Sequence, residues 1–409
     1  MLILKPETIG YMNKKIVIFG AGKIGRSFIG QLFSRSGYEI VFVDTQKVLI
    51  DQLNERKSYS VVIKSNQGDE HQDIKNVRGI LAQDEAQIIK ELATCALACL
   101  SVGQKALPFV APVLGKGIIQ RAKTLKNTPL DIIIAENMRN ADSYIRSQIA
   151  SHIPNDIDIN KMVGLVETSI GKMVPIMEES EIEKDPLLVY AEPYNTLILD
   201  AKAFKNPIPE VKGLAPKQNM KAWVDRKLFV HNLGHAVAAY IGNYHLPKAK
   251  YIYEVLEDEL VKKLTLNAMR ESSLVLQKNY PHEFTKEALD EHIADLVERF
   301  QNKALGDTVF RVGCDLPRKL SAEDRLACPI KLAESMQLDF DTMLLAYNVS
   351  GMFKAESMDG KRPEQDKLVN EEYKQNGMEY LLCKYGKFNK EQNKSVFKQS
   401  SLIDSALSI

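Results

Sequence analysis

A glycine-rich segment near the N-terminus constrains the fold of this chain more than any other feature. The apolar run at residues 16–19 leads directly into Gly20-Ala-Gly-Lys-Ile-Gly25, and an amphipathic stretch follows it. A second apolar run, residues 40–43, ends at Asp44. Strand, glycine turn, helix and second strand in this order are typical of the first unit of a doubly wound, mainly parallel sheet.

The three glycines predict a site for a dinucleotide. Gly20 permits a tight turn, Gly22 lets the backbone approach a diphosphate, and Gly25 lets the helix pack closely on the strand. An acidic residue at the end of the second strand accepts hydrogen bonds from the adenosine ribose and repels a 2′-phosphate, which favours NAD over NADP. The predicted NAD-binding residues are Gly20, Ala21, Gly22, Lys23, Ile24, Gly25 and Asp44, with Val102 and Gly103 after a later strand. A glycine turn that binds nothing is the alternative.

The length of the chain indicates two domains. Its 409 residues exceed the roughly 250 to 300 at which a single core stops growing. Short strand-like runs alternate with helical stretches in the first half, whereas apolar residues at helical spacing dominate after about residue 216. We therefore predict an α/β fold, with a Rossmann-type NAD-binding domain over residues 12–200 and a mainly α-helical substrate or catalytic domain over residues 201–409. Residues 1–12 are left out of this prediction.

The charge balance and the cysteines restrict the partners. With 54 basic and 53 acidic side chains, the chain carries no net field that would attract nucleic acid or an anionic membrane. Its apolar runs are far shorter than the roughly 20 residues that cross a bilayer. The five cysteines form no CxxC pair and favour a reducing compartment. We expect a cytoplasmic monomer or small homo-oligomer that binds a small molecule.

One segment of the second half carries groups suited to catalysis. Residues 227–235 read Lys-Leu-Phe-Val-His-Asn-Leu-Gly-His. On an α-helix, Asn232 lies roughly 140° and His235 roughly 80° around from Lys227, so the three share one broad face. A lysine in an apolar cleft becomes a usable base, an amide stabilises an oxyanion, and a histidine orients a hydroxyl or carbonyl. Ordinary structural roles for all three, or a two-histidine metal site at His231 and His235, are the alternatives.

The Lys-x4-Asn-x2-His pattern at positions 227, 232 and 235 resembles the signature of the polyol-specific long-chain dehydrogenases. Three further motifs support this resemblance: Gly20-Ala-Gly-Lys-Ile-Gly-Arg-Ser-Phe-Ile-Gly30, Ala135-Glu-Asn-Met138 and Arg311-Val-Gly-Cys-Asp-Leu-Pro-Arg-Lys-Leu-Ser-Ala-Glu-Asp-Arg325. The similarity covers most of residues 14–350. Within the family these motifs look most like the branch that interconverts mannitol 1-phosphate and fructose 6-phosphate with NAD.

The resemblance implies a role for each matching residue, without a metal. Lys227 would be the general acid/base, Asn232 and Asn137 would form the oxyanion hole, and His235 would hold the reacting oxygen. Asn140 is close enough in sequence to rival Asn137. Arg311 and Lys319 would contact the substrate, with Arg318 and Arg325 as further cations or, alternatively, as part of a solvated helix start.

Two departures from the family pattern leave other functions open. Residues 170–175 lack the aspartate that many members carry before the Val-Pro or Thr-Pro step, and Leu197 stands where a tryptophan is expected. A hexuronate reductase acting on tagaturonate or fructuronate is therefore one alternative. A non-catalytic NAD-binding sensor is the other, although such a protein has no need for Lys227, Asn232 and His235 together.

Overall fold

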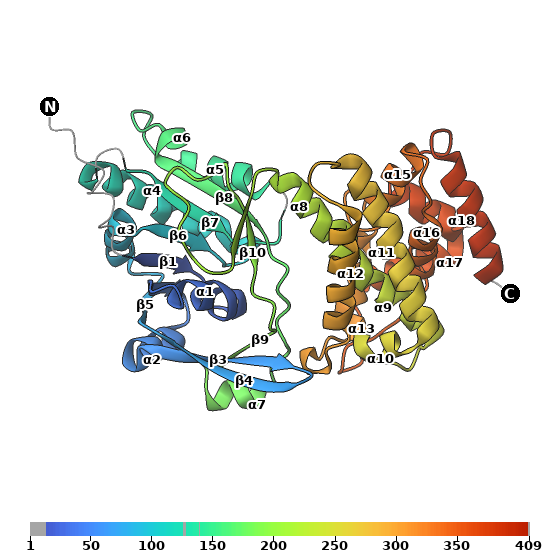
Figure 1. The fold of residues 1–409 in the computed structure, drawn as a ribbon, viewed down its shortest axis with the longest axis horizontal. Helices are drawn as coiled ribbons and strands as arrows, with labels where there is room; N and C mark the ends of the chain where they lie inside the picture. Colours follow the sequence, from blue (N-terminus) through green and yellow to red (C-terminus); the bar gives the residue numbers. More distant parts are fainter. Residues whose placement is uncertain (1–13, 126–127, 139, 408–409) are drawn as a thin grey trace. The chain divides into compact units, whose positions relative to one another are not determined.

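A computed structural model describes residues 14–125, 128–138 and 140–407, and the chain forms two compact units (Figure 1). The first unit ends at Trp223 and the second begins at Val224, whereas the sequence placed the boundary near residue 200. Strand β11 (Leu214–Lys217) accounts for the difference, because it pairs in parallel with β10 (Leu197–Asp200) inside the first unit. Residues 1–12, which were left out of the domain prediction, lie outside the described residues.

An eight-stranded sheet forms the first unit, in the order β11-β10-β8-β7-β6-β1-β2-β5. The paired strands run parallel except β10, which is antiparallel to β8. The six remaining strands are β1 (Lys15–Phe19), β2 (Glu39–Asp44), β5 (Val77–Leu81), β6 (Leu97–Leu100), β7 (Leu130–Ile134) and β8 (Val163–Ser169). The predicted Rossmann-type sheet is confirmed.

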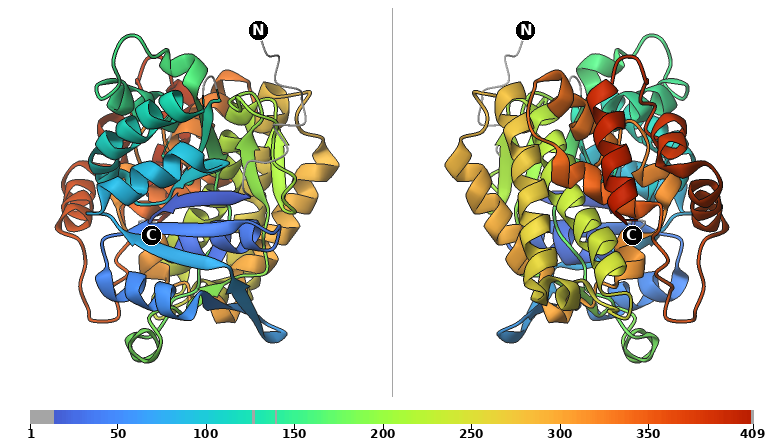
Figure 2. Two further views of the ribbon diagram at one scale, coloured as in Figure 1. Left: turned by 90° about the vertical axis from the view of Figure 1, so that its left-hand side faces the viewer. Right: turned by 90° about the vertical axis from the view of Figure 1, so that its right-hand side faces the viewer.

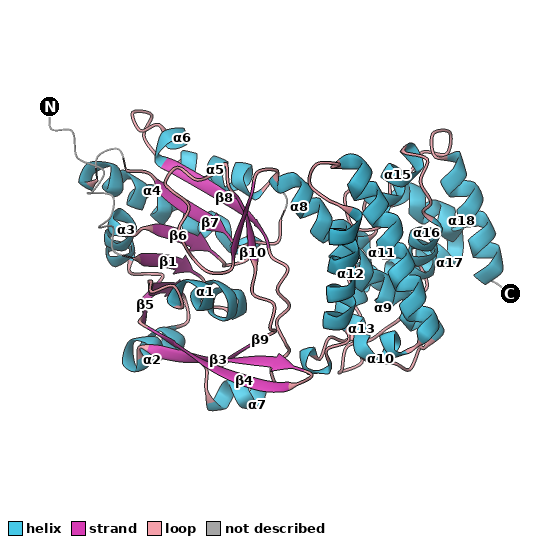
Figure 3. Ribbon diagram, viewed as in Figure 1, coloured by secondary structure: helices cyan, strands magenta, loops and turns pink. Residues whose placement is uncertain are grey.

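Both faces of this sheet are covered, as its apolar strands require. Along β1, Ile16 and Ile18 belong to one buried cluster and Val17 and Phe19 to another, because successive side chains of a strand point to opposite faces. The first cluster continues into the helical segment after the glycines, and the second into α3, α4 and α5. Figures 2 and 3 show the helices and strands of this unit. Its helices are η2 (Gly25–Gly30), α1 (Gln31–Ser34), α2 (Lys47–Arg56), α3 (Glu85–Thr94), η3 (Gln104–Ala106), α4 (Leu107–Thr124), α5 (Ala141–Ala150), α6 (Ile159–Met162) and α7 (Glu179–Lys184).

A second, three-stranded sheet was not predicted from the sequence. It consists of the antiparallel hairpin β3 (Ser58–Ser65) and β4 (Gly68–Lys75), with β9 (Val189–Ala191) parallel to β3. Strand β4 is polar along most of its length and mostly exposed, so it lacks the apolar alternation by which strands are recognised.

The second unit is helical, as predicted, and α9 (Leu233–His245) lies in its core. Every residue of α9 from Leu233 to Asn243 is buried. Within the described part of the chain, no helix is long and apolar enough to span a bilayer. Helix α8 (Met220–Arg226) contains the division between the units, and η4 (Lys227–Asn232) joins it to α9. The other helices are α10 (Ile252–Glu257), α11 (Glu259–Asn279), α12 (Lys286–Phe300), η5 (Lys303–Leu305), α13 (Val309–Gly313), α14 (Leu316–Lys319), α15 (Ala327–Ser335), α16 (Asp341–Ser350), α17 (Glu364–Lys384) and α18 (Lys394–Leu407).

Candidate functional site

The glycine-rich turn has the backbone geometry that a dinucleotide site needs. Gly20 has a φ of +94°, in the region that favours glycine, and a Cβ atom there would collide with the carbonyl oxygen of Ser101. A Cβ at Gly25 would collide with the carbonyl oxygen of Gly20, so only glycine allows the helix to begin this close to the strand. A Cβ at Gly22 would meet no atom within 4 Å, which leaves its backbone open to a diphosphate.

Asp44 lies against this turn, at the end of β2. Its Oδ2 atom accepts a hydrogen bond from the backbone N–H of Ala21 at 2.8 Å, and Oδ1 accepts one from Gln46 N–H at 3.0 Å. Asp44 is half-buried, and Gly22 and Lys23, which follow Ala21 in the chain, are exposed. The turn and the carboxylate, the predicted sites for the diphosphate and the ribose, therefore lie side by side.

Arg26 supports the glycine-rich turn by hydrogen bonds to backbone carbonyl oxygens. Its guanidinium is buried and donates to the carbonyl oxygens of Ala21, Pro186 and Leu187 at 2.7 to 2.9 Å. Tyr59 adds a hydrogen bond from its hydroxyl to the carbonyl oxygen of Arg26. These contacts make Arg26 part of the support of the loop.

The carboxylate of Glu136 binds the backbone of residues 102 and 103, which the sequence predicted to contact the cofactor. Its Oε1 atom accepts hydrogen bonds from the N–H groups of Val102 at 2.7 Å and Gly103 at 2.9 Å. Burial raises the pKa of this carboxyl, and the two backbone hydrogen bonds oppose that rise. The N–H groups of residues 102 and 103 thus already have a hydrogen-bond acceptor within the protein. The sequence did not indicate this role for Glu136.

The two candidate asparagines follow β7 in the first unit. Asn137 is exposed in the segment after the strand, and Asn140 precedes α5 with a φ of 51°. Asn137 and Asn140 are both exposed, so the choice of Asn137 as the oxyanion donor stays a prediction.

In the second unit, Lys227 and Asn232 are the first and last residues of η4, a single π-helical turn. The backbone N–H of Leu233 bonds to the carbonyl oxygen of Leu228, five residues earlier. Side chains five residues apart come closer to alignment in such a turn than on an α-helix, and π-turns are frequent at functional sites. The turn therefore brings Asn232 nearer to the face of Lys227 than the predicted α-helical spacing would.

Burial controls the protonation of this segment. Burial, with a smaller contribution from the positive charge of Arg325, lowers the pKa of Lys227 to about 8. Burial also lowers the pKa of His231 and of His235 well below the ordinary histidine value, with nearby cations adding to the effect. The segment thus offers an amine that exchanges a proton near neutral pH beside two neutral imidazoles.

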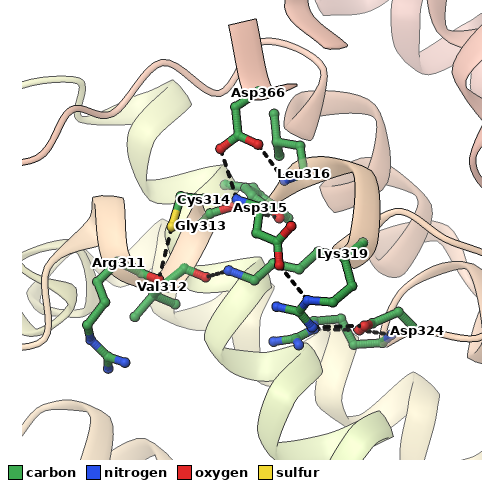
Figure 4. Close-up of polar contacts among 12 residues, drawn as sticks. Arg311, Val312, Gly313, Cys314, Asp315, Leu316, Lys319, Asp324 and Asp366 are labelled. Carbon is green, nitrogen blue, oxygen red and sulfur yellow. Dashed lines mark hydrogen bonds and ion pairs between the residues drawn. The ribbon is translucent and has the colours of Figure 1, made fainter. Parts of the chain in front are cut away.

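Arg311 and Lys319 occupy contrasting environments. The Arg311 side chain is half exposed and forms an ion pair with the buried carboxylate of Asp307. Lys319 is buried, and its Nζ atom donates to the carbonyl oxygen of Val312 at 2.5 Å, as Figure 4 shows. Burial and Arg325 lower the pKa of Lys319 to about 8. Both residues thus lie in the same short stretch of chain, one facing solvent and one enclosed.

The stretch that carries Lys319 is held by a residue far along the chain. The buried carboxylate of Asp366 accepts hydrogen bonds from the N–H groups of Asp315 at 2.9 Å and Leu316 at 2.8 Å (Figure 4). Arg318 pairs with Asp315 and Asp324, whereas Arg325 is buried and pairs with Asp324. Arg325 also reaches the carbonyl oxygen of Asn232 at 3.5 Å, so it is close to the Lys227 segment.

The histidines do not form a recognisable metal site. The rings of His231 and His235 lie 5.8 Å apart in an edge-on arrangement, and His235 is stacked on Phe300 with ring centroids 4.0 Å apart. Among the residues whose positions are described, no group of three or more His, Cys, Asp or Glu side chains is placed to hold a metal ion.

Comparison with protein families matches both units. Residues 14–213 match the model of the mannitol dehydrogenase Rossmann domain, and residues 219–381 match that of the mannitol dehydrogenase C-terminal domain. The mannitol-1-phosphate 5-dehydrogenase of Brevibacillus brevis is 34% identical over 76% of this chain and 79% of its own. The enzyme of the same name from Streptococcus mutans is 32% identical over 88% of this chain and 92% of its own.

Two solved structures share the fold at low sequence identity. A D-sorbitol dehydrogenase in substrate-free form has a TM-score of 0.80 at 14% identity, over 96% of this chain and 93% of its own. The mannitol 2-dehydrogenase of Pseudomonas fluorescens, solved as a ternary complex with NAD and D-mannitol, has a TM-score of 0.73 at 16% identity, over 98% of this chain and 93% of its own.

Proposed function

The chain belongs to the mannitol dehydrogenase family, and we propose that it interconverts mannitol 1-phosphate and fructose 6-phosphate. Family membership makes it an NAD-dependent oxidoreductase that acts on CH–OH groups. The finer assignment rests on the two relatives named above, which are mannitol-1-phosphate 5-dehydrogenases. The observation that carries the chemistry is a lysine with a pKa near 8 on the same helical segment as Asn232 and His235.

The residues of the first unit fit NAD. Gly22 leaves room for the diphosphate, and the Asp44 carboxylate would bind the ribose hydroxyls and repel the 2′-phosphate of NADP. NAD, when bound, accepts the hydride in oxidation and its reduced form supplies it in reduction.

The residues of the second unit transfer the proton and stabilise the negative charge that develops on the reacting oxygen. In reduction, the ammonium of Lys227 gives its proton to the oxygen of the ketose carbonyl, and in oxidation its free amine takes the proton of the alcohol. The amide of Asn232 donates to the same oxygen as negative charge develops on it. His235 orients the sugar by a hydrogen bond. None of these roles requires a metal.

A phosphate suits the cations of the segment 311–325. The side chain of Arg311 is half exposed and can offer two parallel donors to an oxyanion. Lys319 and Arg325 add positive charge in the same segment. A hexuronate would offer a carboxylate to the same groups, so the substrate must be tested directly.

The deciding experiment follows NADH absorbance with fructose 6-phosphate, free fructose and fructuronate in parallel. Turnover confined to fructose 6-phosphate is expected; preferred turnover of fructuronate would replace the proposal with the hexuronate reductase. NADH binding without turnover of any ketose would favour the sensor.

The same assay tests the role of Lys227. Lys227→Ala should lower kcat by about 10²- to 10⁴-fold, because general acid/base catalysis contributes that much. NADH affinity, measured by fluorescence quenching, should stay nearly unchanged. Lys221→Ala, which removes an exposed lysine on α8, is the matched control. Full activity in Lys227→Ala would remove the lysine from the mechanism.

We further propose a cytoplasmic location for the protein. The cysteines of the described residues carry thiols and form no disulfide with one another, as in a reducing compartment. A phosphorylated sugar as substrate agrees with this location.

A further inference from the structure

Asp307 lies between two residues that the proposed mechanism uses. One carboxylate oxygen, Oδ1, pairs with the guanidinium of Arg311. The other, Oδ2, lies 3.6 Å from Nε2 of His235. Oδ2 and Nε2 are both buried, and neither has a hydrogen-bond partner among the described residues. Two buried polar atoms facing each other at this distance are costly unless they bond, and hydrogen bonds in ligand-free sites are often long and tighten on binding.

The surroundings of His235 decide which form of the ring takes part. Besides the carboxylate of Asp307, the charged groups near it are the cations Arg311, Arg325, Lys319 and Arg299, and the neighbouring His231 is buried as well. Burial and these positive charges together lower the pKa of His235 and favour a neutral imidazole. A neutral imidazole has one N–H and one lone pair, and the partner of one ring nitrogen determines the role of the other. The stacking of His235 on Phe300 fixes the plane of the ring but not the position of its proton.

We propose that Asp307 is a positioning residue that fixes the tautomer of His235. Its Oδ2 atom accepts a hydrogen bond from Nε2–H, and Nδ1 is left as an acceptor. His235 then accepts a hydrogen bond from a substrate hydroxyl, while Lys227 and Asn232 donate to the reacting oxygen. Because the same carboxylate holds Arg311, one buried group positions both an anion-binding side chain and the imidazole.

Exchange of a carboxylate for an amide provides a sharp test. Asp307→Asn keeps the shape of the side chain but allows its amide to donate to Nε2, which reverses the tautomer to Nδ1–H. The inference rests on the proposed function for its catalytic meaning, but the tautomer itself can be measured without substrate. Long-range ¹⁵N NMR of histidine-labelled protein, with the His235 signals assigned from their loss in His235→Asn, reports which nitrogen carries the proton.

In the native protein, Nδ1 of His235 should resonate as an unprotonated nitrogen. A protonated Nδ1 there would overturn the inference, whether or not Asp307→Asn folds. In the folded variant, Nδ1 should become protonated; an unchanged tautomer would also overturn it.

Kinetics then tests the catalytic consequence. With the ketose that the native enzyme reduces, Asp307→Asn should lower kcat by about 10- to 100-fold, the usual effect of losing a partner that orients a functional histidine. The KM for the ketose should rise much less, because the amide oxygen of the variant still accepts a hydrogen bond from Arg311. Asp290→Asn, at a partly exposed carboxylate on α12 paired with Lys286, is the control and should leave both constants unchanged. A rise in KM with kcat unchanged would assign Asp307 to substrate binding alone. Absence of fructose 6-phosphate turnover in the native enzyme would count against the proposed function and not against the tautomer.

Discussion

The lowered pKa of Lys227 predicts how the rate of each direction depends on pH. With a pKa of about 8, roughly a tenth of the amine is unprotonated at pH 7. At the ordinary value of 10.5 the unprotonated fraction would be about 0.0003, so burial and the charge of Arg325 together supply about 300-fold more of the base that oxidation needs. Oxidation of mannitol 1-phosphate should therefore rise with pH up to about 8 and then level off. Reduction of fructose 6-phosphate needs the ammonium, and its rate should fall as pH passes through the same value.

The assay is kcat/KM in both directions from pH 7 to 10, a range above the second phosphate pKa of about 6 so that only the enzyme titrates. Arg325→Gln removes the positive charge that lowers the pKa of Lys227, so both inflections should move to higher pH. Arg318→Gln removes an exposed positive charge from the same stretch and is the control that should leave them in place. Profiles without an inflection near pH 8, or an inflection that Arg325→Gln does not move, would refute the assignment of Lys227 as the titrating group.

Two further predictions concern carboxylates that hold backbone N–H groups. Asp44→Ala should weaken NAD binding and reduce the preference for NAD over NADP, because the carboxylate that repels the 2′-phosphate is lost. The measurement is the ratio of kcat/KM with NAD to kcat/KM with NADP, and an unchanged ratio would contradict the role of Asp44. Asp366→Ala leaves the N–H groups of Asp315 and Leu316 without their acceptor and should lower the free energy of unfolding by about 3 kcal/mol, with a matching loss in Tm by calorimetry. Equal stability of this variant and the native protein would show that water replaces the carboxylate.

Local sequence was sufficient for much of the nucleotide-binding unit. Gly20, Gly25 and Asp44 act through the turn and the strand end on which they lie, so their spacing already predicts the geometry that the structure has. The apolar runs predicted the buried strands for the same reason. The hairpin of β3 and β4 was not predicted because β4 is polar and mostly exposed, and its pairing with β3 cannot be recognised from apolar alternation.

Local sequence also selected Lys227, Asn232 and His235, which lie within one helical segment. It did not predict the π-turn that joins the first two, because that geometry differs from an α-helix by a single hydrogen-bond register. Helical spacing therefore predicted the wrong angle between Lys227 and Asn232, and the catalytic role of the segment stays a prediction.

The sequence by itself determined the doubly wound first unit and the helical second unit. It also indicated the family, because the signature residues of that family lie close together along the chain. Only the tertiary structure revealed the carboxylates that support these residues: Glu136 at the backbone of 102–103, Asp307 beside His235, and Asp366 at the stretch of Lys319. These partners are separated from the groups they hold by about 30 to 70 residues. No periodicity or short motif encodes such contacts, because they exist only once the helices and strands have packed.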